Sequence, residues 1–254
     1  MRRAGQINAE ALAAARDATH PGATTADLNA AAEEVLKKYG VYSPFLNYPG
    51  PYPYPASTTV SVNEELVHGI PSRKRKLRTG DIVSIDCGTV YDGFVADSAI
   101  TVPVGEVAEN IDQLLQVTEE AVFIGAAKMV AGNRVGDVSA AIQDYVESHS
   151  LQVTREYTGH GVGRQMHEGP QVPNYGTPGR GMMLRVGMTI ALEPMVLIDS
   201  PSTRVLNDQW TVVSRNGLPT AHFEHTIAIT ADGPWILTLL ENGESPGRIK
   251  QVKV

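Results

Sequence analysis

The chain has 254 residues, a net charge of −7 and one cysteine. A single cysteine excludes an internal disulfide and a cysteine-ligated zinc finger, the negative charge disfavours a general DNA-binding protein, and no apolar run reaches the roughly 18 residues of a membrane span. These features predict a cytoplasmic protein, and the length allows one or two domains.

Two alanine-rich helices are predicted to open the chain, over residues 5–19 and 24–39, because apolar residues recur there at helical spacing. The run Thr24-Thr-Ala-Asp-Leu28 is typical of a capped helix start. Both helices are predicted to be packing elements.

Two polar segments follow the helices. The first, from Asn63 to Pro71, contains His68. The second is the basic run Arg73-Lys-Arg-Lys-Leu-Arg78, which is either a solvated loop or a surface for an acidic partner.

A hairpin with two aspartates is predicted next. Residues 81–88 and 94–102 alternate apolar and polar residues, and Asp92-Gly93 between them is a turn signal. In an antiparallel hairpin with an even-length loop, paired residues have numbers whose sum is odd. Because 86 + 97 = 183, Asp86 and Asp97 are predicted to share a face, directly opposite or one diagonal step apart.

Cys87 is predicted to lie on the other face of this hairpin and not to be a ligand. The alternative for the two aspartates is that they are ordinary turn or edge-strand charges.

Two further helices are predicted over residues 109–130 and 137–148, and Asp137 is predicted to be the N-cap of the second. These are also interpreted as packing elements.

Histidines occur in two sequence segments after these helices. His160 lies among three glycines in Gly159-His-Gly-Val-Gly163, and glycine lets the backbone approach a ligand closely. The run is no dinucleotide-binding loop, because Arg164 stands where its last glycine is needed. His167 follows seven residues later; each histidine is either a ligand or an ordinary core or surface residue, and the second reading holds for His20 and His149.

Two glutamates interrupt apolar strands, Glu193 within residues 188–196 and Glu224 within residues 221–230. A carboxylate in such a strand is costly unless it is paired or metal-bound. Pro194 cannot donate a ladder hydrogen bond, so its strand lies at an edge or ends there. His222 is predicted to share the face of Glu224 and His225 to point the other way; an ion pair with arginine is the alternative for each glutamate.

Four carboxylates and one imidazole therefore form a candidate metal site: Asp86, Asp97, His160, Glu193 and Glu224. The carboxylate charge of −4 balances two divalent cations, and oxygen-rich sites suit hard or borderline metals. A pair of such metals usually activates water for hydrolysis.

These phrases together resemble the methionine aminopeptidases of type I, the bacterial-style branch of the pita-bread metallopeptidases. The resemblance runs along nearly the whole chain, from Met1 to Thr238. It implies one catalytic domain over residues 1–254 with an α/β (α+β) fold: a curved antiparallel sheet in pseudo-twofold halves, with helices on its outer face. The type II branch carries an inserted subdomain, for which the 224 − 193 = 31 residues between the two glutamates leave little room.

The resemblance also implies the roles of single residues. The metal ligands are those named above, and His68 and His167 contact substrate. The pocket for the methionine side chain is lined by Tyr54, Thr59, Met166 and Trp210. In the family, Phe is frequent at 166, Cys occurs at 59, Gln is common at 222, and the segment at 49–55 is usually shorter.

The implied activity is removal of N-terminal methionine from nascent chains whose second residue is small. Two divalent metals, Fe(II), Mn(II) or Co(II), would activate water. Glu193 would shuttle the proton, His167 would polarise the scissile carbonyl and His68 would hydrogen-bond the adjacent peptide nitrogen. The expected partners are nascent N-termini and, through the basic run, ribosomal RNA; the expected state is a monomer.

Two alternatives stay open. One is a proline-directed aminopeptidase of the same fold, which normally has an extra N-terminal domain. The other is an inactive pita-bread protein that binds peptides, although such proteins typically lose ligands and this chain keeps all five.

Overall fold

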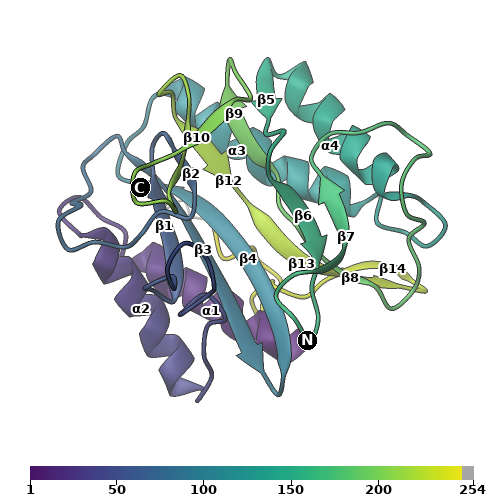
Figure 1. Cartoon of the computed structure of the whole chain (residues 1–254), viewed down its shortest axis with the longest axis horizontal. Coiled ribbons are helices and arrows are strands. Elements are labelled where there is room, and N and C mark those ends of the chain that lie inside the picture. The colour runs from purple at the N-terminus through teal and green to yellow at the C-terminus, as the bar shows by residue number, and fades with distance from the viewer. Residues whose placement is uncertain (248–254) are drawn as a thin grey trace.

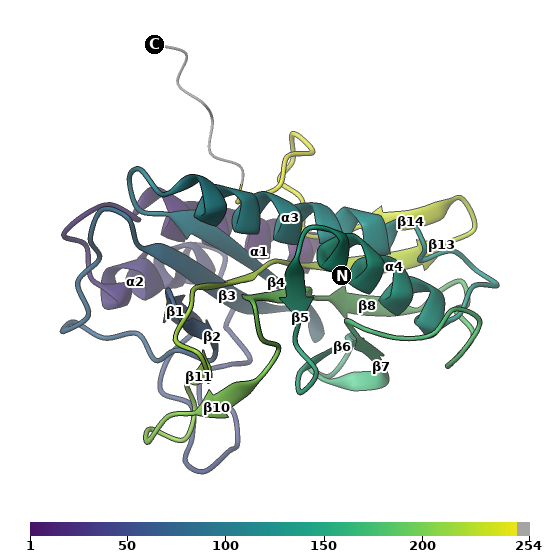
Figure 2. The same cartoon turned by 90° about the horizontal axis from the view of Figure 1, so that it is seen from above.

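A layer of helices covers one face of a curved antiparallel sheet in the computed structural model, which describes residues 1–247 (Figures 1 and 2). The last seven residues of the predicted domain 1–254 lie outside this range. Within the described part, the helices are α1 (Arg2–Asp17), α2 (Thr25–Lys38), α3 (Glu109–Ala126) and α4 (Val135–Ser148).

The predicted helices are confirmed, with shifts at their ends. Helix α1 begins three residues before the expected position, and α3 ends four residues before it. The capped start of α2 is confirmed, because the Thr24 side chain accepts from the Asp27 backbone and the Asp27 carboxylate accepts from the Thr24 backbone.

The predicted N-cap at Asp137 is wrong. Arg134 is the N-cap of α4, and Asp137 is the third residue of the helix. Its carboxylate accepts a hydrogen bond from the Arg134 backbone at 2.7 Å, which is the reciprocal half of a capping interaction. Arg134 also forms an isolated bridge with Met183, and the chain turns into the helix directly after it.

The central sheet has eight strands, seven of them in the order β1-β3-β4-β13-β8-β6-β7, and β14 pairs with β13. Helices α1 and α2 lie over the half that contains β3 and β4, and α3 and α4 lie over the other half (Figure 1). The seam is the pairing of β4 with β13, so the expected two-half pita-bread fold is confirmed. The strands are β1 (Thr58–Val62), β3 (Ile82–Tyr91), β4 (Phe94–Pro103), β6 (Thr158–Gly161), β7 (Glu168–Pro173), β8 (Thr189–Leu192), β13 (Glu224–Thr230) and β14 (Gly233–Ile236).

Two small three-stranded sheets add to the central one. In Figure 2, β10 and β11, together with β6 and β7, project from the side of the sheet that the helices leave uncovered. The first small sheet is β10 (Thr203–Val205), β11 (Val212–Ser214) and β2 (Glu65–Val67); the second is β12 (Thr220–His222), β9 (Met195–Ile198) and β5 (Leu151–Val153).

The main core fills the space between the helices and the sheet. Leu12 of α1, Leu114 of α3 and Ile100 of β4 are completely buried there. Cys87 belongs to this core, as the predicted alternation requires. In the described part of the chain, no helix combines the length and the apolar character that crossing a membrane demands.

Candidate metal centre and adjoining pocket

The β3–β4 hairpin places two carboxylates on the uncovered face of the sheet. Asp86 pairs with Ala99 and Asp97 pairs with Gly88, so the two aspartates lie one diagonal step apart, as predicted. Asp92 and Gly93 form the two-residue turn with φ of 51° and 70°, values that right-handed strand twist favours in a hairpin.

A buried side chain of α1 fixes the back of this hairpin. The Asn8 amide donates to the backbone oxygen of Cys87, and its oxygen accepts from the Ser98 hydroxyl. Cys87 and Ser98 pair across the hairpin and are the neighbours of Asp86 and Asp97. The helix layer thus holds the backbone that carries both aspartates.

Both glutamates lie where a strand is interrupted. Strand β8 ends before Glu193 and β9 resumes at Met195, so the predicted local end at Pro194 is confirmed. The expected continuous strand over residues 221–230 is wrong, because β12 ends at His222 and β13 begins at Glu224. These breaks free both carboxylates from strict strand alternation, and both line the same cavity as the aspartates.

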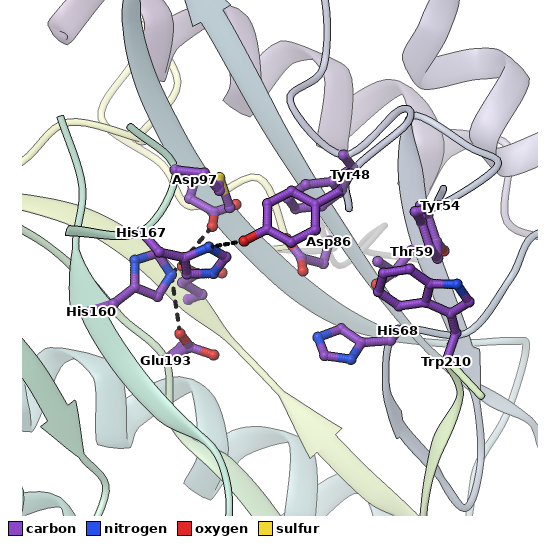
Figure 3. Close-up of a pocket in the computed structure, with 13 residues that line it drawn as sticks. Tyr48, Tyr54, Thr59, His68, Asp86, Asp97, His160, His167, Glu193 and Trp210 are labelled. Carbon is purple, nitrogen blue, oxygen red and sulfur yellow. Dashed lines mark hydrogen bonds and ion pairs between the residues drawn. The ribbon is translucent and has the colours of Figure 1, made fainter. Parts of the chain in front are cut away.

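His160 on β6 completes the cluster. Its Nε2 lies 3.8 Å from Asp97 Oδ2 and 3.5 Å from Glu193 Oε1 (Figure 3). Its Nδ1 lies 2.9 Å from the backbone oxygen of Gly161, a contact that Nδ1–H makes as a donor, so the Nε2 lone pair faces the carboxylates.

The glycines around His160 are required by close backbone contacts. A Cβ on Gly161 would lie 2.1 Å from the Gly169 oxygen, and one on Gly159 would lie 2.7 Å from the Ala191 oxygen. These glycines were predicted to let the backbone approach a ligand or a metal; in the structure the segments that approach them are the neighbouring strands.

The cluster fits divalent metal. One ligand atom each from Asp97, His160 and Glu224 lie within 4.8 Å of one another. In residues 1–247, no lysine or arginine pairs with the four carboxylates, and one oxygen each of Asp86, Asp97 and Glu224 is buried without a hydrogen-bond partner. Such a set is costly alone and matches the oxygen-rich coordination of hard and borderline cations.

Burial and mutual repulsion raise the pKa values of these carboxyl groups in the metal-free protein. Desolvation raises the pKa of Asp86 to about 7. Desolvation first, and the neighbouring carboxylates second, raise the pKa values of Asp97, Glu193 and Glu224 well above normal. Desolvation also lowers the pKa of His160 to about 4, so its imidazole is neutral at pH 7 and free to bind metal.

This arrangement predicts how stability of the metal-free protein depends on pH. Above about pH 7.5 the histidines are almost entirely neutral in both states, whereas the folded Asp97, Glu193 and Glu224 carboxyls retain protons that the unfolded chain, with pKa values of about 4, has lost. Each retained proton lowers the free energy of unfolding by about 1.4 kcal/mol per pH unit. The melting temperature in chelator should therefore fall from about pH 7.5 to 9, and Glu193→Gln should flatten the fall; a melting temperature that rises over this range would contradict it.

His222 is a further imidazole beside the cluster. It is buried, and its Nε2 lies 3.7 Å from Glu193 Oε2 and 4.0 Å from Glu224 Oε2. Its predicted position on the face of Glu224 is correct. His225 points the other way, as predicted, and contacts Thr238 and Phe123 among the helices.

A cavity of about 170 Å³ opens beside the carboxylates. All the residues predicted to line the methionine pocket or to contact substrate line this cavity, namely Tyr54, Thr59, His68, Met166, His167 and Trp210. Figure 3 shows Tyr54, Thr59 and Trp210 on one side, Asp97, Glu193 and His160 on the other, and Asp86 between them. Phe45 and Tyr48 also line it, although the sequence pattern gave no signal for either.

His68 stands between two cavities. Its φ of 63° is rare for a residue with a side chain, and its ring makes edge contacts with Trp210 and Tyr157. Desolvation lowers its pKa to about 4. A second cavity of about 470 Å³ lies beyond it and shares His160, His167 and Glu193 with the first.

The long segment at residues 49–55 forms part of the pocket wall. A Cβ on Gly50 would lie 2.4 Å from the Trp210 indole, so glycine is needed where the segment crosses that ring. Tyr52 donates to the backbone oxygen of Asp208 at 2.8 Å, close to Trp210 in the chain. Residues of this segment therefore lie against the pocket and hold one side of it.

Known proteins are similar to this chain in sequence and in fold. The chain matches the model of metallopeptidase family M24 over residues 1–231. It is 48% identical to a methionine aminopeptidase of Clostridium acetobutylicum over 241 residues, 95% of both chains, and 47% identical to methionine aminopeptidase 1 of Bacillus subtilis, with 94% of both covered.

Solved structures of similar proteins have the same fold. The methionine aminopeptidase of Thermotoga maritima matches with a TM-score of 0.91 and 47% identity over 94% of both chains. A prolidase of Pyrococcus horikoshii matches with a TM-score of 0.72 at 23% identity, and this chain covers 61% of it. At that identity the prolidase shares the fold alone.

Proposed function

The chain belongs to the methionine aminopeptidases of metallopeptidase family M24 and is a metal-dependent hydrolase, and from this premise we propose that it removes the N-terminal methionine of nascent polypeptides whose second residue is small. One observation carries the proposal: the carboxylate and imidazole cluster lies at the junction of a small, largely apolar cavity and a larger open one. The first suits one side chain, and the second suits the peptide that follows it.

Asp86, Asp97, His160, Glu193 and Glu224 would hold two divalent cations. Support comes from the charge of −4, the single neutral imidazole and the buried oxygens without hydrogen-bond partners. When bound, the metals would lower the pKa of water and so supply the nucleophile; Fe(II), Mn(II) or Co(II) suits this ligand set.

Protein side chains would then handle the protons. Glu193 would take a proton at its carboxylate and deliver it to the leaving amine. His167 would donate a hydrogen bond to the scissile carbonyl oxygen, and His68 would hydrogen-bond the adjacent peptide nitrogen. Both histidines line both cavities, and burial lowers both pKa values, which supports neutral imidazoles in these roles.

The apolar cavity would select an unbranched side chain. Met166 and Tyr54 are buried in one apolar cluster, and Trp210 packs against it. We expect norleucyl-Ala-Ser, which has the length of methionine without sulfur, to be cleaved, whereas Val-Ala-Ser should not be. In a series of Met-X-Ser peptides, Gly and Ala at X should support cleavage and Leu or Lys should not; equal rates for all members would refute the proposed specificity.

The basic run supports a further part of the proposal, a transient contact with ribosomal RNA. Arg73, Lys74, Arg75, Lys76 and Arg78 are exposed, and none forms an ion pair within 4 Å in the described chain. Hydrogen bonds from Thr25 to the Arg75 oxygen and from Leu77 to the Ala23 oxygen fix the loop, so its charge stands at a defined place. Phosphate backbones attract such charge.

Replacing Arg73, Lys74, Lys76 and Arg78 by Ser should reduce co-sedimentation with ribosomes at low salt and leave cleavage of short peptides unchanged. Undiminished co-sedimentation would remove this part of the proposal.

We further propose that residues 1–254 form one catalytic domain that acts as a monomer in the cytoplasm, where nascent chains emerge. One continuous core between the helices and the sheet supports the single domain. The proline-directed alternative rests on fold likeness at 19–23% identity, and an inactive module would not be expected to keep every predicted ligand around one cavity.

A further inference from the structure

Tyr48 makes a direct contact with a histidine of the site. Its hydroxyl oxygen lies 2.7 Å from His167 Nδ1, and the two rings meet edge to face with centroids 5.5 Å apart (Figure 3). On its other side, the His167 ring lies 4.3 Å from the ring of His160, centroid to centroid. The exposed His167 ring therefore lies between a phenol and a predicted metal ligand.

The backbone around Tyr48 is held in place by its own hydrogen bonds. The Tyr48 N–H donates to the Phe45 oxygen at 2.8 Å, and the Tyr54 N–H donates to the Tyr48 oxygen at 3.0 Å. Asn47 donates to the Tyr54 oxygen at 2.8 Å with a φ of 64°. This network presents the hydroxyl at a fixed place instead of on a free loop.

The available hydrogen-bond partners indicate that the Tyr48 hydroxyl donates and His167 Nδ1 accepts. In the part of the chain that the structure describes, His167 Nδ1 is the one acceptor within reach of the Tyr48 O–H. If Nδ1 carried the proton instead, the phenol would have to turn its own proton to solvent, because the described protein offers it no other acceptor. A donating Tyr48 satisfies both groups, and it leaves the imidazole proton on Nε2.

We propose that Tyr48 is a positioning residue that holds His167 in the Nε2–H tautomer. The inference rests on the proposed function, in which His167 donates a hydrogen bond to the substrate carbonyl. A neutral imidazole with its proton on Nδ1 would turn a lone pair toward that oxygen and repel it. Tyr48 thus selects the one neutral form that can stabilise the developing negative charge.

Kinetics of Tyr48→Phe test this role, because phenylalanine keeps the ring and removes the hydroxyl. We expect kcat for Met-Ala-Ser to fall about 10-fold, a typical cost of one hydrogen bond, while KM changes less than about 2-fold. In a His167→Ala background the same substitution should change kcat less than about 2-fold, because the partner is already absent. Tyr39→Phe is the matched control, since its hydroxyl also makes a 2.7 Å bond, to Glu10 among the helices, and its kcat should be unchanged.

An equal loss in both backgrounds, or a change confined to KM, would show that Tyr48 is merely part of the pocket wall and would overturn the proposal. If the wild-type protein fails to cleave Met-Ala-Ser, the proposed function fails and the kinetic test does not apply; the tautomer is then decided by spectroscopy alone.

Nitrogen NMR of the histidine rings provides that second measurement. In protein loaded with diamagnetic Zn(II), His167 should show a proton on Nε2 and an unprotonated, hydrogen-bonded Nδ1. Tyr48→Phe should give a mixture of tautomers, and Tyr39→Phe should leave the pattern intact; His167→Ala identifies the signals. A proton on Nδ1 in the wild type would overturn the inference whatever the activity.

Discussion

Glu193→Gln is expected to lower kcat/KM for Met-Ala-Ser by roughly 10³-fold or more, because it removes a metal ligand and the proposed proton carrier in one step. The substitution nearly preserves shape, so the fold should survive. Glu193 lies 3.5 Å from His160 and is followed by the proline that ends its strand.

The same variant should lose activity but gain thermal stability in the metal-free state. Without metal, Glu193 is one of four largely buried carboxyls without a cationic partner, and glutamine removes the free-energy cost of keeping this group protonated in the folded state at pH 8. The metal-free variant should therefore melt at a higher temperature than the metal-free parent at pH 8. The control is Glu147→Gln on α4, which alters an ion pair with Arg155 and should retain activity. An active Glu193→Gln protein would exclude Glu193 from the chemistry.

His160→Ala is expected to lose metal affinity by more than the roughly 10–100-fold that loss of a ligand's supporting partner costs, and to lose activity with it. His160 supplies the one nitrogen among the predicted ligands, and its hydrogen bond to Gly161 aims that nitrogen at Asp97 and Glu193. Metal content after dialysis, measured by elemental analysis, should fall below that of the parent protein.

The matched control for this variant is His20→Ala, since His20 is exposed and remote from the predicted ligands. Parent-like metal content in His20→Ala with reduced content in His160→Ala would tie the effect to the site. Full metal content and full activity in His160→Ala would refute the ligand assignment.

Local rules predicted the parts of the site that regular strands position. Strand alternation and the Asp92-Gly93 turn correctly placed Asp86 and Asp97 on one face, and Cys87 on the other. Once the pairing of a hairpin is set, strand alternation determines which face of the sheet each side chain takes. The convergence of His160, Glu193 and Glu224 on that face came from the family resemblance, because pairings between distant strands are not encoded locally.

The sequence predicted less well where tertiary contacts override local patterns. The strand through Glu224 was expected to be continuous, yet it breaks at Phe223, whose N–H makes a 3.3 Å bond to the Pro194 oxygen. The start of α4 was predicted three residues too late, at Asp137, because the bridge between Arg134 and Met183 sets where the helix begins. Tyr48 had no signal at all, since its role depends on a partner 119 residues away.

The central claim is that this chain is a metal-dependent methionine aminopeptidase, and one assay tests it most directly. Protein stripped with chelator should be mixed with Met-Ala-Ser or Ala-Pro-Ser, with and without added Co(II), Mn(II) or Fe(II). We predict release of methionine only when metal is restored, and no cleavage of Ala-Pro-Ser. Cleavage of the proline peptide alone would indicate a proline-directed enzyme, and no cleavage by folded, metal-loaded protein would contradict enzymatic function.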